Sequence, residues 1–400
     1  MNSWDCFDTL LARRYVHPHT VFIETGKRLG DSDFLGKRLS AESMSDGTYS
    51  SIYERLPNID PEIEFQVELE HCFGIVENIN RVKDGDIVVS DMYLTADHIK
   101  RLLVSCGLKK DIKIHVTPGG KREGWIWNHL NGIDLHVGDN YNADVTSPSQ
   151  HGIKAEHYNG HLFNNIEEEV SKSDHQLACW MRYVRLSCPY VGDEAKYWFD
   201  QSNYNLPVLA LASLELPDEP LAFTYRDCIY FHPLYEKITG KTAVKLHASR
   251  HCYYNPMEGY IDHVLKQTEG RTIVDLQGSG KSIASFFEKL QKPMPKVIYL
   301  SGPAEKPFEV ILDIGTDTLE RHNCSELGTL AGFGDLPIRL FSEHPENVIK
   351  VQSEAMKLAI DSTHLFSINR NKTLMNNLWI KMCTDFTYKS MNWSGEHFIG

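Results

Sequence analysis

Short apolar segments alternate with helical segments along most of this sequence, and polar residues follow the apolar segments. In the first part of the chain the apolar segments are residues 86–90, 113–116 and 134–137, with helical patterns at residues 95–106 and 125–130 between them. A second alternation begins near Leu221, with apolar segments at residues 221–224, 243–247, 272–276 and 296–300. Strands and helices that alternate at this spacing predict parallel sheets with helices on both faces. The expected fold class is therefore α/β, with two Rossmann-like sheets.

The chain of 400 residues is longer than one hydrophobic core usually serves. We expect a first α/β domain over residues 1–158, with a helical insert at about residues 14–82. Residues 159–206 are acidic and then aromatic, and we interpret them as a connector. Residues 207–345 are expected to form the second α/β domain, and residues 346–400 a C-terminal helical segment.

Charge and cysteine content limit the classes of partner. A formal net charge of −13 argues against nucleic acid and anionic membranes, because those partners need clustered Lys and Arg. The nine cysteines show no zinc-ligand spacing and are interpreted as free thiols in a reducing compartment. No apolar run approaches the roughly 18 residues of a membrane helix. We therefore expect a cytoplasmic protein with neither a nucleic acid nor a membrane as its partner.

Polar residues with complementary chemistry follow the predicted strands of the first domain. They are Asp5, where a very short strand is expected within residues 3–7, and Ser90, Lys121 and Asp139, with Asp144 shortly after. Ligands of parallel sheets bind beyond the carboxyl ends of the strands, so these side chains are expected to converge. A carboxylate can attack phosphorus, and a hydroxyl and an ammonium can hold the phosphoryl oxygens. A second carboxylate can bind Mg²⁺, which offsets the repulsion between carboxylate and phosphate.

These residues resemble the four motifs of the haloacid-dehalogenase-like (HAD) superfamily, in the family's order. The matching residues are Asp5 with Thr9, Ser90, Lys121, and Asp139 with Asp144. The resemblance covers roughly residues 1–155. In the wording of its motifs the domain is most similar to predicted HAD hydrolases of bacterial surface-polysaccharide gene clusters.

The resemblance implies a fold and a set of roles. Asp5 would be the covalent nucleophile, and Ser90 and Lys121 would bind the phosphate. A magnesium site would be formed by the set Asp5, the backbone carbonyl of Phe7, Asp139 and Asp144. The helical insert at residues 14–82 would be a cap that closes over this site.

One position departs from the family pattern. HAD phosphatases usually carry a second Asp two residues after the nucleophile as general acid and base, but here Phe7 occupies that place and the carboxylate follows at Asp8. Loss of such a group typically lowers the rate by about 10²–10⁴-fold. Three interpretations stay open: Asp8 takes over the role, the substrate has a good leaving group, or catalysis is weak. Relatives without this Asp include dehalogenases, phosphonate-cleaving enzymes and inactive scaffolds.

A second candidate site follows the apolar segment at residues 272–276. The segment continues to Gly-Lys-Ser, but Asp275 stands where a nucleotide-binding P-loop needs glycine. Backbone N–H groups at the start of the following helix are suited to a phosphate, and Asp275 is suited to ribose hydroxyls. The candidate ligand-binding residues of this turn are Asp275, Ser279, Gly280, Lys281 and Ser282.

This turn resembles the phosphoribosyl-diphosphate loop of phosphoribosyltransferases, and Arg250 after another strand would belong to the loop that binds the diphosphate. The family usually has two adjacent acidic residues and threonines, whereas here Val274 precedes Asp275 and both hydroxyl residues are serines. The alternative is a glycine-rich turn that serves only packing. Residues 225–227, Tyr-Arg-Asp, either add to this site or form a surface salt bridge.

The sequence thus predicts a Mg²⁺-dependent phosphomonoesterase that acts on a small phosphorylated metabolite through an aspartyl phosphate. One alternative is a phosphoribosyltransferase-type or nucleotide-binding activity of the second domain, with phosphoribosyl diphosphate or a nucleotide as ligand. The other is a catalytically weak HAD scaffold that binds a partner, which Phe7 favours.

Overall fold

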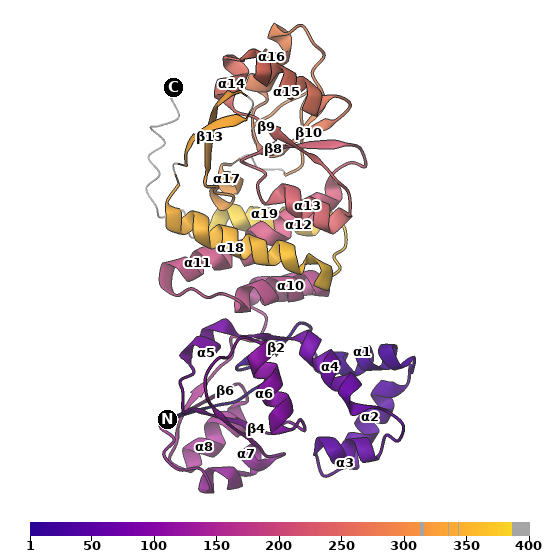
Figure 1. Cartoon of the computed structure of the whole chain (residues 1–400), viewed down its shortest axis with the longest axis vertical. Coiled ribbons are helices and arrows are strands. Elements are labelled where there is room, and N and C mark those ends of the chain that lie inside the picture. Colours follow the sequence, from indigo (N-terminus) through magenta and orange to yellow (C-terminus); the bar gives the residue numbers. More distant parts are fainter. Residues whose placement is uncertain (313–315, 335, 343, 386–400) are drawn as a thin grey trace. The chain divides into compact units, whose positions relative to one another are not determined.

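The computed structural model describes residues 1–312, 316–334, 336–342 and 344–385. These residues form two compact units, and each is described by itself (Figure 1). The first unit contains residues 1–168 and 186–189, and the second contains residues 169–185 and those from 190 onward. Each unit has a five-stranded parallel sheet. The predicted α/β class with parallel sheets is therefore confirmed.

The first unit is built around the sheet β5-β4-β1-β6-β7. Its elements are β1 (Asn2–Trp4), β2 (Leu11–Arg13), α1 (Thr20–Leu29), α2 (Phe34–Ser43), α3 (Tyr49–Glu54), α4 (Pro61–His71), β3 (Cys72–Gly74), α5 (Val76–Arg81), β4 (Ile87–Ser90), α6 (Ala96–Ser105), β5 (Lys113–Val116), α7 (Gly120–Glu123), the 3-10 helix η1 (Trp125–Asn128), β6 (Leu135–Gly138), the π-helical η2 (Tyr141–Thr146), α8 (Ser147–Gln150) and β7 (Lys154–His157).

The first strand lies at the centre of this sheet, although it has only three residues. Trp4 is opposite Val88 of β4 on one side and Val137 of β6 on the other. These three side chains are buried, as the apolar composition of fully covered parallel strands requires. The register brings the carboxyl ends of β1, β4 and β6 to one edge of the sheet.

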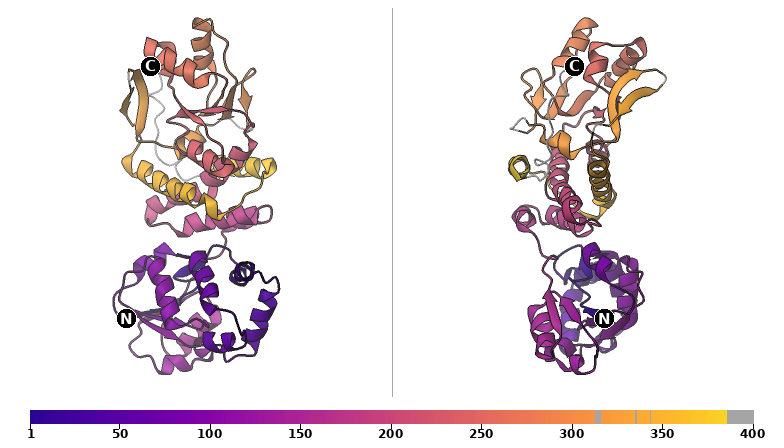
Figure 2. Two further views of the ribbon diagram at one scale, coloured as in Figure 1. Left: turned by 45° about the vertical axis from the view of Figure 1, so that its right-hand side comes forward. Right: turned by 90° about the vertical axis from the view of Figure 1, so that its left-hand side faces the viewer.

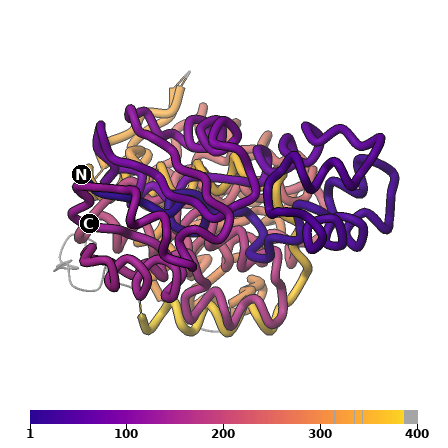
Figure 3. The backbone as a smooth tube through the Cα atoms, turned by 90° about the horizontal axis from the view of Figure 1, so that it is seen from below, coloured from indigo at the N-terminus to yellow at the C-terminus, as the bar shows by residue number. Residues whose placement is uncertain are grey.

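Helices α1–α4 form the helical insert, which leaves the first unit between β2 and β3. These two short strands pair antiparallel, with Leu11 opposite Gly74, and thus form the stem of the insert. Figure 3 shows the insert as a separate lobe on one side of the unit. Its interior holds a buried ion pair, since Arg38 contacts both carboxylate oxygens of Glu64 at 2.7 and 3.1 Å. The Arg38 guanidinium also lies 4.5 Å from the ring of Tyr93, which follows β4.

The second unit is built around the sheet β12-β11-β10-β8-β9. Its elements, with α9 (Asn165–Ser171) at the boundary between the units, are α10 (His175–Leu186), α11 (Gly192–Asp200), the π-helical η3 (Gln201–Asn205), α12 (Leu206–Glu215), β8 (Leu221–Tyr225), α13 (Phe231–Thr239), β9 (Val244–His247), α14 (Arg250–Tyr254), α15 (Glu258–Thr268), β10 (Thr272–Gln277), α16 (Lys281–Lys289), β11 (Val297–Ser301), β12 (Glu309–Val310), α17 (Thr318–His322), β13 (Leu327–Phe333), β14 (Pro337–Phe341), α18 (Glu346–Ser362), the 3-10 helix η4 (Thr363–Leu365) and α19 (Lys372–Asp385).

Helices from both ends of the second unit pack together. The predicted connector, residues 159–206, is largely helical, and Figure 2 shows its magenta helices beside the yellow helices of the C-terminal segment. Trp180 of α10 donates a hydrogen bond to Ser362 of α18 at 3.0 Å. The apolar residues of α10 and α12 are buried, so these helices belong to the core. Of the predicted C-terminal helical segment, residues 346–385 contain α18 and α19, and residues 386–400 lie outside the described residues.

Within the part of the chain that the structure describes, no helix is both long and apolar enough to cross a membrane.

Candidate active site of the first unit

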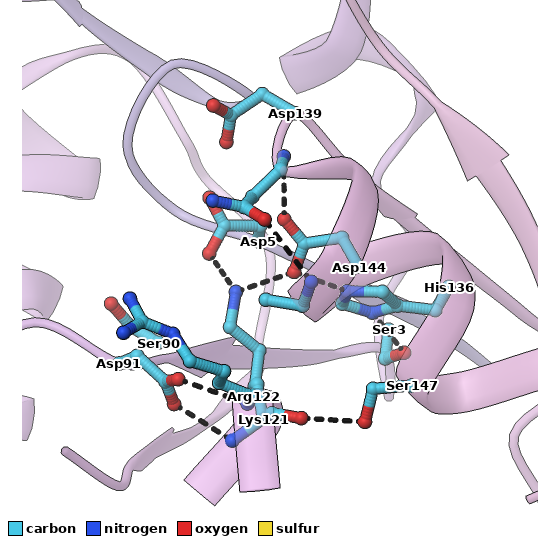
Figure 4. A network of polar contacts seen from close by, with 12 residues as sticks. Ser3, Asp5, Ser90, Asp91, Lys121, Arg122, His136, Asp139, Asp144 and Ser147 are labelled. Carbon is cyan, nitrogen blue, oxygen red and sulfur yellow. Dashed lines mark hydrogen bonds and ion pairs between the residues drawn. The ribbon is translucent and has the colours of Figure 1, made fainter. Parts of the chain in front are cut away.

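Four sequence-predicted residues lie at one edge of the first sheet (Figure 4). Asp5 directly follows β1, Ser90 ends β4 and Asp139 directly follows β6. Lys121 comes from the short helix α7 after β5. Because β1 lies between β4 and β6, Asp5 is flanked by the ends of the two strands that carry Ser90 and Asp139.

The Lys121 ammonium lies between two carboxylates. It donates hydrogen bonds to Asp5 and, at 2.7 Å, to Oδ1 of Asp144 in η2. The Lys121 side chain is 3% exposed, and such a buried cation is stable only when it is paired. Burial alone would lower the pKa of Lys121, but the two carboxylates outweigh it and the pKa is raised.

Three carboxylates share this single ammonium. One oxygen from each of Asp5, Asp139 and Asp144 lies within 4.8 Å of the others. Burial raises the pKa of Asp5 to about 6, although Lys121 acts against it. Burial and the charges of Asp5 and Asp8 raise the pKa of Asp139 to about 8. Burial is thus the main cause of both raised pKa values, and the neighbouring carboxylates add to it.

Asp139 and Asp144 differ in their protein contacts. Asp144 accepts from Lys121, from His136 at 3.1 Å and from the backbone N–H of Asn140 at 2.9 Å. Although burial opposes it, the hydrogen bond from His136 and the Lys121 charge lower the pKa of Asp144 to about 2. No group of the described residues donates a hydrogen bond to the Asp139 carboxylate. A half-buried carboxylate without donors, next to a second carboxylate, fits a hard divalent cation that prefers oxygen ligands.

The loop after β1 presents Asp8 and turns Phe7 aside. The backbone N–H groups of Leu10 and Leu11 both donate to the carbonyl of Cys6 at 2.9 Å, and Asp8 has a left-handed φ of 59°. Ligand atoms of Asp8, Asp139 and His161 lie within 4.8 Å of one another. The carboxylate that follows Phe7 therefore lies beside the candidate metal ligand Asp139.

The Phe7 ring itself packs 4.4 Å from the Arg13 guanidinium. Arg13 is in turn held by Glu68 of the insert at 2.7 Å. The Phe7 side chain thus contributes to packing at the stem of the insert, and it has no ionisable group that could act as a general acid.

Two residues that the sequence analysis missed hold the backbone of Lys121 in place. Asp91 accepts from the backbone N–H groups of Lys121 at 2.9 Å and Arg122 at 3.3 Å. Ser147 donates to the carbonyl of Lys121 at 2.6 Å and accepts from the indole of Trp127 at 3.0 Å. The sequence did offer one indication of Asp91, because this carboxylate directly follows the candidate phosphate ligand Ser90. Side chains therefore hold both the backbone N–H and the backbone carbonyl of Lys121.

The second unit has a cavity of about 890 Å³ at the carboxyl ends of β8 and β10. All sequence-predicted residues of the second site line it: Asp275, Ser279, Gly280, Lys281, Ser282 and Arg250. Residues 225–227 also line it, and Arg226 pairs with Asp227 at 2.5 Å. The segment therefore lines the cavity and also forms an ion pair, which is half-buried. Glu320 of α17 was missed because its surroundings carry no motif.

Charge and backbone geometry of the cavity are unusual. Burial, followed by the Asp227 charge, raises the pKa of Asp275 to about 7, although Thr224 donates to Asp275 at 2.6 Å. Helix α16 begins after Gly280, which has a left-handed φ of 78°, and no side chain caps it. A Cβ at Gly280 would lie 2.2 Å from the ring of Phe308. This glycine is thus required for packing, and the uncapped helix start faces the cavity.

Comparison of the sequence with models of known protein families finds no matching family, and no curated protein matches it.

Proposed function

We propose that the first unit is a Mg²⁺-dependent phosphomonoesterase in which Asp5 is the nucleophile. The observation that carries this proposal is the shared position of Lys121, Asp5 and Asp139 at the carboxyl edge of a parallel sheet. The resemblance to HAD motifs supports it, because the same residues carry that resemblance. Small phosphorylated metabolites are the substrate class.

The residues divide the reaction into two displacements. Asp5 attacks phosphorus, the bond to the leaving oxygen breaks, and an aspartyl phosphate forms. A water then attacks the same phosphorus, which releases inorganic phosphate and restores the Asp5 carboxylate. Lys121 and the Ser90 hydroxyl hold the phosphoryl oxygens while charge spreads over them. Ser90 accepts from the Met92 N–H at 3.3 Å, and its own hydroxyl hydrogen can be donated to a phosphoryl oxygen.

Asp5, Asp139 and the Phe7 carbonyl would hold Mg²⁺, which when bound would offset the repulsion between the attacking carboxylate and the phosphate. Asp8 is the group that protonates the leaving alkoxide and later takes a proton from water. It replaces the acid that the family carries at the position of Phe7. Asp8 thus compensates for the absence of an Asp at position 7.

Mg²⁺-dependent release of inorganic phosphate from p-nitrophenyl phosphate and a panel of sugar and nucleoside phosphates tests this function. We expect turnover with Mg²⁺, none with EDTA, and recovery when Mg²⁺ is restored. Turnover that EDTA leaves unchanged would contradict the metal site. No turnover with any phosphate ester would favour the scaffold alternative.

Removing the Asp139 carboxyl is expected to flatten the pH dependence of stability. The ordinary pKa of Asp is about 3.9, and that of Asp139 is raised to about 8. Between these values the folded state binds a proton that the unfolded state has lost, so stability falls as pH rises through this window. In EDTA, the melting temperature of Asp139→Asn relative to wild type should therefore increase from pH 5 to pH 8.

Magnesium supplies the control for this prediction. Mg²⁺ binds the ionised carboxylates, so it should stabilise the wild type more at pH 8 than at pH 5 and should stabilise Asp139→Asn little at either pH. If the difference in melting temperature between the two proteins stays constant from pH 5 to pH 8, with and without Mg²⁺, the pKa of Asp139 is not raised.

The cavity favours a second function in the second unit. We propose that it binds phosphoribosyl diphosphate or a nucleotide, with a phosphate at the start of α16 and ribose hydroxyls on Asp275. The supporting observation is that a turn, an arginine and a carboxylate chosen from sequence all line one cavity of about 890 Å³. The size suits a ligand of this class.

Calorimetric titration with phosphoribosyl diphosphate tests the second function. Asp275→Asn should weaken binding by roughly 10–100-fold, because a charge-assisted hydrogen bond contributes about 1.5–3 kcal/mol. Asp262→Asn on α15, which is exposed and outside the cavity, is the matched control and should bind as wild type. Equal affinities of all three proteins, or no binding at all, would remove this function.

A further inference from the structure

A buried histidine lies beneath the candidate active site and has no part in the proposed reaction. His136 is in the middle of β6 and is 0% exposed. Its Nδ1 lies 2.7 Å from the Ser3 hydroxyl, and its Nε2 lies 3.1 Å from Oδ1 of Asp144. Ser3 and His136 are direct neighbours across the β1–β6 pair. The sequence analysis missed both, since each lies inside a short strand and belongs to none of the recognised motifs.

The direction of each hydrogen bond in this chain is determined by chemistry. The Asp144 carboxylate forms an ion pair with the buried Lys121 ammonium at 2.7 Å, so it is ionised and can only accept. His136 Nε2 must therefore carry a hydrogen. The fully buried ring belongs to the same hydrogen-bonded chain as the Lys121 ammonium, which disfavours a second positive charge, so the ring is neutral and Nδ1 has no hydrogen and accepts. The Ser3 hydroxyl is thus the donor to Nδ1.

The chain ends at the catalytic lysine. Oδ1 of Asp144 accepts both from His136 and from Lys121, at 2.7 Å for the latter, and Oδ2 accepts from Asn140. Both oxygens of Asp144 are therefore engaged by protein donors, in contrast to Asp139. The Trp127 ring packs against the His136 ring with centroids 4.8 Å apart and keeps its plane fixed.

We propose that Ser3 and His136 are positioning residues: they fix Asp144 as the acceptor that holds Lys121 at Asp5, and Asp144 acts through Lys121 and not as a metal ligand. This inference rests on the proposed phosphatase function. A hydrogen bond from Nε2 fixes the carboxylate plane, and the carboxylate fixes the ammonium. Outer groups of this kind typically change activity by about 10–100-fold when they are replaced.

Variants of His136 separate positioning from packing. In His136→Gln the amide nitrogen can reach the place of Nε2 and donate to Asp144, whereas His136→Met has a similar volume but no donor. We expect kcat to fall by about 10–100-fold in His136→Met and by less than about 5-fold in His136→Gln, with KM little changed in both. The Mg²⁺ affinity, measured by calorimetry, should stay within about 2-fold of wild type in both variants and be lost in Asp139→Asn.

A tautomer measurement makes the test independent of turnover and of folding of the Met variant. In the metal-free wild type, ¹⁵N NMR should show a neutral His136 with hydrogen on Nε2, assigned by its loss in His136→Gln. In Ser3→Ala the Nε2–H form should lose population and kcat should fall by about 3–10-fold. Hydrogen on Nδ1 in wild type, equal kcat of the Gln and Met variants, or loss of Mg²⁺ affinity in both would overturn the proposal.

These outcomes are distinct from failure of the phosphatase function itself. A wild type without phosphatase activity would refute the function, while the tautomer and the Mg²⁺ affinities of the variants would still support or overturn the role of Ser3 and His136.

Discussion

Replacing Asp5 by Asn is expected to reduce Mg²⁺-dependent phosphate release by about 10⁴-fold or more, which is the scale of losing a covalent nucleophile. Asn has nearly the same shape but cannot form an acyl phosphate. The variant should remain folded, because burial already disfavours the Asp5 charge and raises its pKa to about 6. At pH 8 in EDTA, the melting temperature should therefore equal or exceed that of wild type. Initial rates and thermal unfolding measure the two effects.

Asp84→Asn, at an exposed carboxylate between α5 and β4, is the matched control. It should keep the wild-type rate and melting temperature. Residual turnover of Asp5→Asn within about 10-fold of wild type would rule out covalent catalysis by this residue. A loss of rate that comes with unfolding of the variant would instead show a structural role of the carboxylate.

Replacing Lys121 by Met is expected to have the second-largest effect, and it acts on stability as well as on activity. Removing one partner of a buried ion pair typically costs about 3–5 kcal/mol, and Lys121 holds two carboxylates. Without the ammonium, Asp5, Asp139 and Asp144 repel one another. Urea unfolding in EDTA at pH 8 should show this loss. Mg²⁺ should restore part of the stability, because it replaces some of the missing positive charge.

Turnover of Lys121→Met should also fall by roughly 10²–10³-fold, since the ammonium no longer stabilises the transferring phosphoryl group. Lys83→Met, at an exposed position that the structure places before β4, supplies the control and should unfold as wild type. An unfolding free energy of Lys121→Met within about 1 kcal/mol of wild type would mean that the pair is solvated and not part of a charged site.

The edge of the first sheet could be predicted because strand order matters little to the argument. Residues that follow parallel strands gather at one edge whichever strands are neighbours, so the convergence of Asp5, Ser90 and Asp139 followed from the predicted strand ends. The contacts of Asp91 and His136 could not be predicted in this way. They join residues 30 and 133 positions apart in sequence, and they depend on the register of β1 with β6 and on the place of α7.

In the second unit, the strand-to-helix turn was predictable and its surroundings were not. Hairpin β13–β14 contributes Thr329 and Phe341 to the cavity, and α17 contributes Glu320. These residues have no local pattern that indicates a ligand, because their place depends on how the chain returns after β12. The same holds for α10, whose buried Trp180 and Met181 were assigned to a connector. An aromatic segment does not reveal which core it joins.

The most direct test of the central claim is to trap the phosphorylated enzyme. Wild type with Mg²⁺ and a phosphate ester is quenched in acid, reduced with borohydride, and digested for mass spectrometry. The aspartyl phosphate should be reduced to homoserine at position 5, in wild type and not in Asp5→Asn or without substrate. Phosphate release with no homoserine at position 5, or with homoserine at another position, would contradict covalent catalysis by Asp5.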